Sequence, residues 1–386
     1  MGNPNLTPFR ILAVAHIIVG LLLLPLTPRL RIGPEPLNSA AMSWKVLITA
    51  RTMNEVGVSA LQLLREANCE LLIPPKPGPF SPDELLKILL DVDGVLASMD
   101  KFTTAVLESP AAAKLKIISR WGVGYDAIDV PTATRRGIVV AYVPGLLDEA
   151  VADFAFALLL ALARRVHIGH LDMINGVWRG VWGNDVFGKT LGILGCGRIG
   201  RAVARRATGF NMRLIAHDVQ PSHEAECLGV KFVSLDELLA QSDFLSLHAA
   251  LTPQNRGLIG EAQLRMMRKT AYLINTARGA LVDESALARA LQEGWIAGAA
   301  LDAFAVEPLP ADHALRKAPN VLLTPHLASW ARETGERVST TAAQAIVDLM
   351  NGRRPPLVVA PEVFDSPSLR AKLKSETFGK AGGLKS

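Results

Sequence analysis

The stretch Thr190-Leu-Gly-Ile-Leu-Gly-Cys-Gly-Arg-Ile-Gly200 decides the fold. It opens with a short apolar run that predicts a buried strand, and three glycines follow in the spacing G-x-G-x-x-G. A helical pattern over 198–208 starts inside the motif. In such a strand–turn–helix unit, Gly195 permits the tight turn, Gly197 lets the backbone approach a pyrophosphate, and Gly200 lets the helix pack closely on the strand.

Two features beside the glycines predict a dinucleotide site. The free N–H groups of Arg198 and Ile199 would lie at the positive end of the helix, where phosphates bind. A second apolar run over 213–218 ends in Asp218, about 20 residues after the glycines, where a ribose 2′-hydroxyl needs an acceptor. Because an acid there repels a 2′-phosphate, the sequence predicts NAD in preference to NADP. The alternatives are a tight turn in another α/β protein and the glycine-rich turn of a methyltransferase.

Apolar runs alternate with helical patterns on both sides of the motif, which predicts an α/β protein with two doubly wound parallel sheets. Ahead of the motif, strands are expected over 45–50, 69–73, 94–98, 115–120 and 138–143, and helices over 56–66 and 82–90. Ser81 is the expected N-cap of the second helix, with Pro82 at its first position. From 190 to 326 a second series predicts about six parallel strands, enough for a whole dinucleotide-binding domain.

Two long helices are expected around the second series. Residues 150–165 form a helical pattern that is apolar on all sides, so this helix should link domains, form a subunit interface, or do both. A helix over 331–350 is expected to return to the first domain. Beyond Pro355 the periodicity fades, and residues 367–386 are expected to be disordered.

Composition and charge exclude some classes of function. The chain has 386 residues, of which 49% are hydrophobic and 20% charged, as in a globular protein with room for two domains. Its net charge of +5 comes from the two ends, because residues 1–41 carry +2 and residues 366–386 carry +4. A nearly neutral body offers no basic groove, so no nucleic-acid partner is expected.

The cysteines and the N-terminal apolar run bear on the compartment. Cys69, Cys196 and Cys227 are odd in number and lack metal-ligand spacing, which argues for a reducing compartment without disulfides or a metal site. The run 11–26 has three interpretations: an extension ahead of a true start at Met42, a signal peptide, or a membrane anchor. A redox cofactor and unpaired cysteines favour the cytoplasm, with no membrane partner unless that run is an anchor.

Candidate catalytic groups follow strands of the second series, at the sheet edge where open α/β sheets bind ligands. Arg278 follows one predicted strand, Asp302 and Glu307 follow the next, and His326 follows the last. A Gly-x-Gly turn at 122–124 follows a strand of the first domain. Each residue alone is explained better as a surface or loop residue. Together, beside a dinucleotide motif, they predict an oxidoreductase.

Hydride transfer to a 2-keto acid explains these residue types. The reduction needs a proton for the developing alkoxide, and histidine supplies one because its usual pKa lies near neutrality. A neighbouring carboxylate would favour the charged form of the histidine. Arginine would bind the substrate carboxylate through a planar fork, and the N–H groups of a Gly-x-Gly turn would bind it without crowding.

At these residues the chain resembles the D-isomer-specific 2-hydroxyacid dehydrogenase family, over about residues 43–352. The matching stretches are Gly122-Val-Gly-Tyr-Asp-Ala-Ile-Asp129, residues 188–200, Asn275-Thr-Ala-Arg-Gly279, residues 302–308 and Pro325-His326. The segment Ile118-Ser-Arg-Trp-Gly-Val-Gly124 resembles the phosphoglycerate dehydrogenase-like branch of the family, here without its regulatory domain.

The resemblance implies a Rossmann cofactor domain inserted in a flavodoxin-like substrate domain, with NAD as the cofactor. The cofactor domain would span 143–326 and the substrate domain 43–142 plus 327–352, between an extension over 1–42 and a tail over 353–386. The resemblance also implies a homodimer that forms through the helix near 150–165.

The resemblance further implies roles for single residues. Arg278 would orient the substrate, Glu307 would pair with the histidine, and His326 would be the acid/base. Cofactor contacts would come from Gly195, Gly197, Arg198, Ile199, Gly200, Asp218, Ala249, Thr276, Ala277 and Asp302. Substrate contacts would come from Ser98, Arg120, Val123 and Gly124. Among these, the backbone of Val123 and Gly124 would take the carboxylate, and Arg120 would face a distal phosphate.

The substrate stays open between 3-phosphoglycerate, glyoxylate or hydroxypyruvate, and another 2-hydroxy acid. Two other functions are possible on the same fold: oxidation of an inorganic oxyanion, as in phosphite dehydrogenases, and a non-enzymatic NAD(H)-sensing scaffold. The lack of a lysine at Trp121 or Gly122 weighs against the first. The presence of Arg278, Glu307 and His326 weighs against the second.

Overall fold

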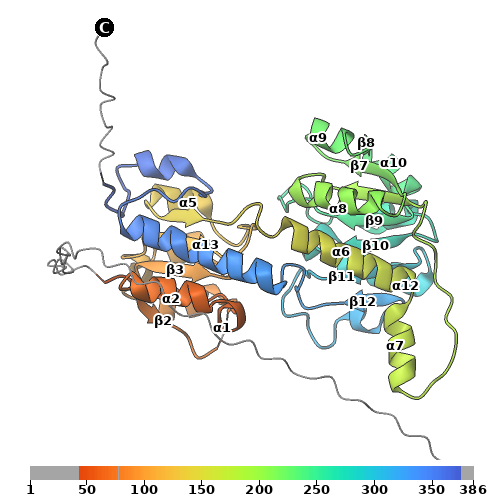
Figure 1. Ribbon diagram of the computed structural model, residues 1–386, viewed down its shortest axis with the longest axis horizontal. Helices are drawn as coiled ribbons and strands as arrows, with labels where there is room; N and C mark the ends of the chain where they lie inside the picture. Colours follow the sequence, from red (N-terminus) through yellow and green to blue (C-terminus); the bar gives the residue numbers. More distant parts are fainter. Residues whose placement is uncertain (1–42, 77, 375–386) are drawn as a thin grey trace, which may run out of the picture. The chain divides into compact units, whose positions relative to one another are not determined.

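The computed structural model describes residues 43–76 and 78–374. These residues belong to one compact unit that contains two parallel sheets (Figure 1). The apolar run 11–26 and the alternative start at Met42 lie outside the described residues, so their interpretation stays a prediction. Of the helices that the structure describes, none combines the length and apolar character needed to cross a bilayer.

The first sheet has five parallel strands in the order β2-β1-β3-β4-β5. They are β1 (Lys45–Ile48), β2 (Glu70–Leu72), β3 (Gly94–Ala97), β4 (Ile117–Arg120) and β5 (Val139–Ala141). Successive side chains alternate between the two faces, so Val46 and Ile48 pack in one apolar core and Leu47 packs in the other. Both faces are therefore apolar and covered, as the alternation of runs in the sequence predicted.

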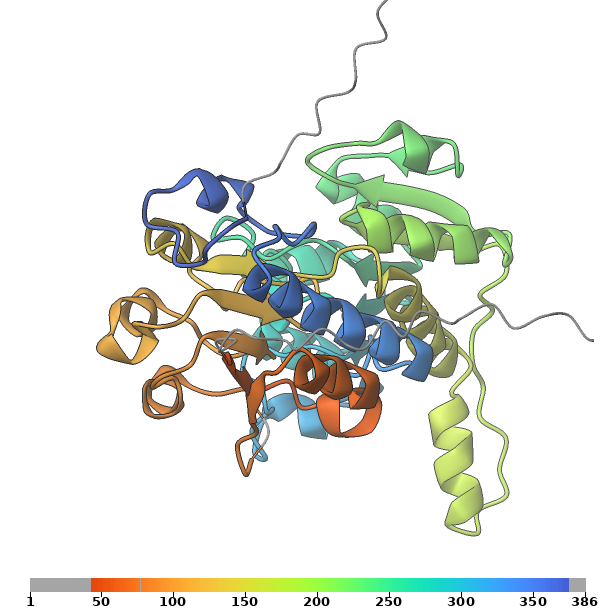
Figure 2. The ribbon, with the colours of Figure 1, turned by 60° about the vertical axis from the view of Figure 1, so that its left-hand side comes forward.

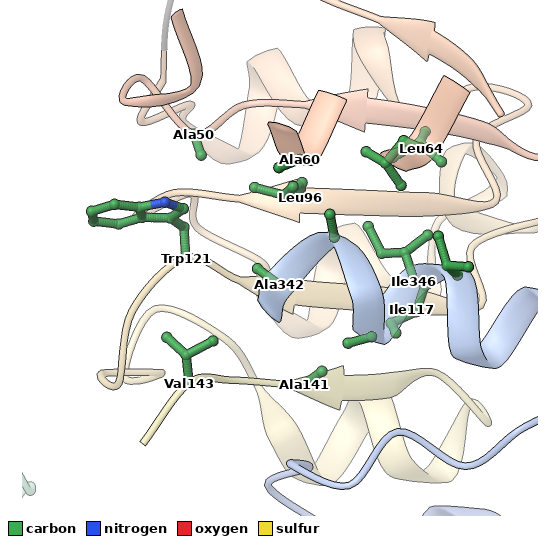
Figure 3. Close-up of a cluster of buried hydrophobic side chains, with 14 of the residues drawn as sticks. Ala50, Ala60, Leu64, Leu96, Ile117, Trp121, Ala141, Val143, Ala342 and Ile346 are labelled. Atoms are coloured by element: carbon green, nitrogen blue, oxygen red, sulfur yellow. The ribbon is translucent and has the colours of Figure 1, made fainter. Parts of the chain in front are cut away.

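Helices cover both faces of the first sheet. On one face lie α1 (Met53–Val56), α2 (Val58–Glu66) and α13 (Arg332–Met350), and on the other α3 (Pro82–Ile88), α4 (Thr104–Glu108) and α5 (Val130–Arg135). Figure 3 shows Ala342 and Ile346 of α13 beside Leu96 and Ile117 of the sheet, in one buried cluster. The last long helix thus returns to the first sheet, as predicted.

The start of α3 has the predicted chemistry. The Ser81 hydroxyl accepts a hydrogen bond from the Glu84 N–H, and the Glu84 carboxylate accepts one from the Ser81 N–H at 2.9 Å. This reciprocal pair satisfies two backbone donors that a helix start otherwise leaves open, and Pro82 follows at the first helical position.

The second sheet has seven parallel strands in the order β12-β11-β10-β9-β6-β7-β8. They are β6 (Thr190–Leu194), β7 (Arg213–His217), β8 (Lys231–Phe232), β9 (Phe244–Leu247), β10 (Tyr272–Asn275), β11 (Gly298–Leu301) and β12 (Val321–Leu323). About six were predicted, because the glycine motif and the apolar run over 213–218 were treated as one unit. That unit supplies two strands, β6 and β7. β6 pairs with β7 on one side and with β9 on the other, so the strand order reverses beside the glycine motif. That reversal is where such sheets bind ligands.

Helices α6 to α12 lie between residues 148 and 293 of the chain. They are α6 (Asp148–Ala163), α7 (Val166–Ile174), α8 (Arg198–Thr208), α9 (His223–Glu226), α10 (Leu235–Gln241), α11 (Glu261–Met266) and α12 (Glu284–Glu293). α8 spans the predicted 198–208. α6 packs on α8 and on strands β10 to β12, so it is a core helix of its own chain.

The chain breaks after α6, because Arg165 takes a left-handed backbone conformation with φ +55°. A second helix, α7, then extends away from the second sheet, as both views show (Figures 1 and 2). The predicted helix over 150–165 is therefore α6, and a group of exposed apolar side chains lies on α7 and the residues that follow it.

The expectation of disorder over 367–386 is wrong for residues 367–374. The chain after α13 packs on the first sheet: the Val359 N–H donates to Val140 O, and Val363 and Ala371 lie in the same core as α13. Arg370 Nη1 donates to Leu115 O at 2.9 Å. A short irregular segment has no periodicity to detect, yet it covers apolar surface. Residues 375–386 lie outside the described residues, and the domain boundaries proposed from the sequence stay predictions.

Candidate active site

One cavity brings the predicted catalytic residues together. It has a volume of about 770 Å³ and is lined by residues that follow strands of both sheets. Arg278, Glu307 and His326 all line it, although they come from loops after different strands. The Gly-x-Gly turn at 122–124 lines it as well. Separate sequence motifs therefore meet at one place, as chemistry on a carboxylate substrate requires.

His326 and Glu307 form the charged pair of this cavity. Both carboxylate oxygens of Glu307 lie 2.9 Å from His326 Nδ1, and the Phe304 N–H donates to Glu307 Oε1 at 3.0 Å. Burial raises the pKa of Glu307, but the hydrogen bond and charge of His326 outweigh burial and hold that pKa below its usual value. Glu307 is therefore ionised at neutral pH, and its contact with Nδ1 leaves Nε2 for a substrate.

The loop over 324–330, called here the His326 loop, is fixed by Asp302. This carboxylate follows β11 and is fully buried. Its donors are Thr324 Oγ1 at 2.6 Å, Leu327 N at 2.8 Å and Ala328 N at 2.8 Å. His326 has φ +58°, and such a left-handed conformation costs a residue with a Cβ about 1–2 kcal/mol. The bonds to Asp302 offset this cost and keep the imidazole in place.

Asp302 was expected to contact the cofactor, and the structure does not place it on the cavity wall. Both its carboxylate oxygens accept hydrogen bonds from the His326 loop, and none of its surface is exposed. Its position in the sequence, directly after a buried strand, does not reveal which way the side chain points. Its observed contacts make it a residue that positions His326.

Arg278 is presented by a turn that its neighbours hold. Asn275 is buried at the end of β10, where its side-chain amide donates to Arg278 O at 2.9 Å and its oxygen accepts from Ala277 N at 3.0 Å. Arg278 Nε donates to Asp126 Oδ1 at 2.9 Å, which joins the second sheet to the loop after β4. A Cβ at Gly279 would collide with the backbone of Phe304.

The Gly-x-Gly turn lies directly against Arg278. A Cβ at Gly124 would collide with Arg278 Nη2, so only glycine lets the guanidinium occupy this position. None of the hydrogen bonds among the described residues uses the N–H of Val123 or Gly124. Two backbone donors and a guanidinium thus converge on one wall of the cavity, which is the donor set that a carboxylate needs.

Arg120 and Ser98 also border the cavity, but Arg120 does not offer its charge to it as expected. The guanidinium donates to Gly124 O at 2.9 Å and to Trp121 O, so it shapes the Gly-x-Gly turn from behind. Burial lowers the pKa of Arg120 to about 10, which leaves it cationic at neutral pH. The predicted contact with a distal phosphate is therefore not supported, because these donors serve the chain itself. Ser98 donates its N–H to Asp100 Oδ2 at 2.9 Å.

The glycine motif forms a cradle that fits a pyrophosphate. Gly195 has φ +88°, and a Cβ there would collide with Ala249 N. A Cβ at Gly200 would collide with Gly195 O, so the helix packs on the turn as predicted. Gly197 has no atom within 4 Å of its Cβ position and therefore faces open space. It precedes the first residue of α8, Arg198, where the free N–H groups of the helix start lie.

The other predicted cofactor residues continue from that cradle. Ile199, Ala249, Thr276 and Ala277 line the cavity. The Thr276 hydroxyl is buried without a hydrogen-bond partner among the described residues, which a ligand would supply. Asp218 follows β7, and its Oδ2 accepts from Cys196 N at 2.6 Å, so the carboxylate sits beside the glycine turn. The residues present fit a dinucleotide that runs from Asp218 across the glycines to Thr276.

Three residues of the cavity were missed by the sequence interpretation. Asp126 pairs with Arg278 across 152 positions of sequence, a separation that carries no local signal. His248 follows β9 and shares a hydrogen bond of 2.7 Å with Ser246 Oγ, and burial lowers its pKa to about 4. Arg51 follows β1 and reaches the His326 loop. Each of the three residues follows a strand, and this position is the one feature of the sequence that could have indicated that they belong to the site.

Comparison with known proteins supports the same interpretation. Residues 156–328 match the family model described as D-isomer specific 2-hydroxyacid dehydrogenase, NAD binding domain. A glyoxylate reductase of Korarchaeum cryptofilum is 45% identical over 330 residues, which cover 83% of this chain and 97% of that protein.

Two solved structures extend the similarity to the whole fold. The TT0316 protein of Thermus thermophilus is 41% identical with a TM-score of 0.73, over 82% of this chain and 99% of that one. A glyoxylate reductase of Paecilomyes thermophila is 32% identical with a TM-score of 0.71, over 82% of this chain and 98% of that one.

Proposed function

Because the chain belongs to the D-isomer specific 2-hydroxyacid dehydrogenase family and uses NAD, we propose that it reduces a small 2-keto acid, glyoxylate in the first place. The observation that carries this proposal is the convergence of Arg278, His326 and the free N–H groups of the Gly-x-Gly turn on one cavity. One cation, two backbone donors and one acid/base are what a carboxylate next to a carbonyl requires.

The residues have the following roles. The N–H groups of Val123 and Gly124 bind the substrate carboxylate, and the Arg278 guanidinium, held by Asp126, orients carboxylate and carbonyl together. His326 donates a proton from Nε2 to the carbonyl oxygen, and the Glu307 carboxylate stabilises the imidazolium beforehand. NADH, when bound, supplies the hydride. In the reverse direction His326 accepts the hydroxyl proton.

Glyoxylate is favoured over 3-phosphohydroxypyruvate by the position of Arg120. That guanidinium was the candidate for a distal phosphate, and it is instead bonded to carbonyls of its own turn. The relatives named glyoxylate reductase support the smaller substrate. Hydroxypyruvate differs from glyoxylate by a hydroxymethyl group, and a cavity of about 770 Å³ leaves room for it beside a nicotinamide.

The test is NADH oxidation against a panel of glyoxylate, hydroxypyruvate, pyruvate and 3-phosphohydroxypyruvate. We expect the highest kcat/KM for glyoxylate or hydroxypyruvate, and a fall of about 10²–10⁴-fold for His326→Gln. A loss smaller than tenfold in that variant would remove His326 from its role. A preference for 3-phosphohydroxypyruvate, or turnover of phosphite with NAD, would overturn the proposed substrate class.

We also propose that the protein is a homodimer. The exposed apolar side chains of α7 and the residues after it are the surface that a second copy would cover; they include Leu171, Ile174, Val177, Trp178, Trp182 and Phe187. Trp178 is 88% and Trp182 96% exposed, and large aromatics rarely stay so exposed in a monomer. Light scattering should give twice the chain mass, and Trp178→Glu with Trp182→Glu should give the chain mass.

The cytoplasm is the compartment we propose. The cysteines at 69, 196 and 227 are free thiols, which suits a reducing environment and an NADH-dependent reaction. Cell fractionation checks this, since recovery of the protein from the exported or the membrane fraction would contradict it.

A further inference from the structure

The His326 loop is held from two sides, and only one of them belongs to the second sheet. On the side of the second sheet, the Asp302 carboxylate accepts hydrogen bonds from Leu327 N and Ala328 N. From the other side comes Arg51, which follows β1 of the first sheet and lines the same cavity. Arg51 Nη2 lies 3.3 Å from Pro325 O and 3.4 Å from His326 O.

A third contact fixes the guanidinium of Arg51. Its central carbon lies 4.7 Å from the ring centroid of Trp330, the last residue of the His326 loop. Stacking of a guanidinium on an aromatic ring is favourable and sets the plane of the donors. One arginine of the first sheet thus touches the loop at both ends, at the carbonyls of 325 and 326 and at the ring of 330.

This arrangement bears on the acid/base because of the backbone at His326. The residue has a left-handed conformation, which relaxes unless its neighbours hold it. The imidazole direction follows from that backbone, and the Arg51 contact is made to the carbonyl of the same residue. Both hydrogen bonds of Arg51 are long. The loop is therefore held by three weak contacts together, namely these two hydrogen bonds and the stacking of the guanidinium on Trp330.

We propose that Arg51, supported by Trp330, is a positioning residue that holds the His326 loop against the first sheet when the two sheets enclose the substrate. The inference rests on the role of His326 under Proposed function. Among the described residues, Arg51 forms no hydrogen bond or ion pair with the His326 ring or the Glu307 carboxylate, so it acts through the backbone. A small displacement of an acid/base is enough to slow proton transfer by one to two orders of magnitude.

The test compares Arg51→Met with a control, Arg65→Met, which removes an exposed arginine from α2, a helix that packs on the first sheet. For Arg51→Met we expect kcat to fall about tenfold, by the same factor for glyoxylate and hydroxypyruvate, with KM for NADH unchanged. The control should leave both constants unchanged. Arg51→Lys should recover only part of kcat, because a lysine keeps the charge but lacks the planar fork that stacks on Trp330.

Trp330 gives the second arm of the test. Trp330→Leu should lower kcat less than Arg51→Met, and the double variant should be no slower than Arg51→Met alone, because both substitutions remove one support. Additive losses would overturn the joint role. A rise in KM for the keto acid with unchanged kcat would also overturn it, since Arg51 would then bind substrate directly.

Amide hydrogen exchange separates this inference from the proposed function. Exchange over 324–331 should speed up in Arg51→Met and not in Arg65→Met, whatever the substrate is. If the wild-type chain reduces no 2-keto acid, the proposed function fails while the exchange result still decides whether Arg51 holds the loop. Unchanged exchange in Arg51→Met would overturn the inference even in an active enzyme.

Discussion

Gly124 shows how much a single residue contributes to the site. Its missing side chain leaves the space that Arg278 Nη2 occupies. In Gly124→Ala the added methyl group must displace the guanidinium. We expect KM for the keto acid to rise at least tenfold and KM for NADH to stay the same, because only the carboxylate loses a partner. Steady-state kinetics with each substrate varied in turn measures both constants.

The matched control for Gly124 is Gly209→Ala. Gly209 is exposed at the end of α8, and the one atom within 4 Å of its Cβ position is Arg206 O at 3.4 Å, an ordinary contact, so this variant should behave as wild type. If the two alanine variants have equal KM for the keto acid, Arg278 tolerates displacement and the assigned geometry is wrong.

A second prediction at this scale concerns His248 and pH. Burial lowers its folded pKa to about 4, from an ordinary value of 6.5. The unfolded chain therefore binds a proton at a higher pH than the folded chain does. The contribution of His248 to stability is then fully present above about pH 6.5 and decreases as the pH falls toward 4, by up to about 3 kcal/mol. Urea unfolding of His248→Gln between pH 4 and 7 should show a shallower pH dependence than wild type.

Single residues also show where sequence analysis stops. The positions of the glycines and Asp218 could be predicted because one strand–turn–helix unit fixes their surroundings, whereas Thr276 was named only through the family resemblance. The direction of the Arg120 guanidinium could not, because its acceptors belong to the turn that it shapes. The Arg278–Asp126 pair depends on how two sheets meet, and no local pattern encodes that.

At the scale of elements, the loops after strands carry the site, and Asp302 shows how one is stabilised. It accepts two backbone N–H groups and one hydroxyl of the His326 loop. In Asp302→Asn one of the two carboxylate oxygens becomes an NH2 group. This group is itself a donor, so it cannot accept the hydrogen bonds that Thr324, Leu327 and Ala328 donate to Asp302. We expect kcat to fall at least tenfold and the free energy of unfolding to fall by about 1–3 kcal/mol.

Asp312→Asn is the control for Asp302, since Asp312 is an exposed acid of the following loop. Chemical denaturation and turnover of both variants provide the comparison. Full activity in Asp302→Asn would mean that the loop keeps its conformation without these bonds.

The elements differ in how well the sequence predicted them. α8 begins and ends where predicted, because the glycine motif sets its start and its apolar face is continuous. The predicted helix over 56–66 is α2, which begins at Val58 and ends at Glu66, and a short helix that was not predicted, α1, precedes it over Met53–Val56. The two helices are separated at Gly57, where a Cβ would collide with Met53. Periodicity gives the existence of an element, while contacts of this kind set its ends.

At the scale of the whole molecule, two sheets contribute different halves of one site. The first supplies the Gly-x-Gly turn and Arg51, and the second supplies Arg278, Glu307 and His326. The sequence predicted both sheets and the return of the last long helix to the first. It did not predict the packing of residues 353–374, because irregular segments bury side chains without any regular spacing.

That packing leads to the last prediction. Val363 is 1% exposed and lies in the core that contains α13, so Val363→Ala removes two buried carbons and should lower the free energy of unfolding by about 2 kcal/mol. Val58→Ala is its control, because Val58 belongs to α2 on the same face of the sheet but is 68% exposed. Thermal and urea unfolding of the two variants measure the difference. Equal stability would show that residues 353–374 are an appendage. A loss confined to Val363→Ala would show that they are part of the first sheet's core, and that a chain cut after α13 has lost part of its fold.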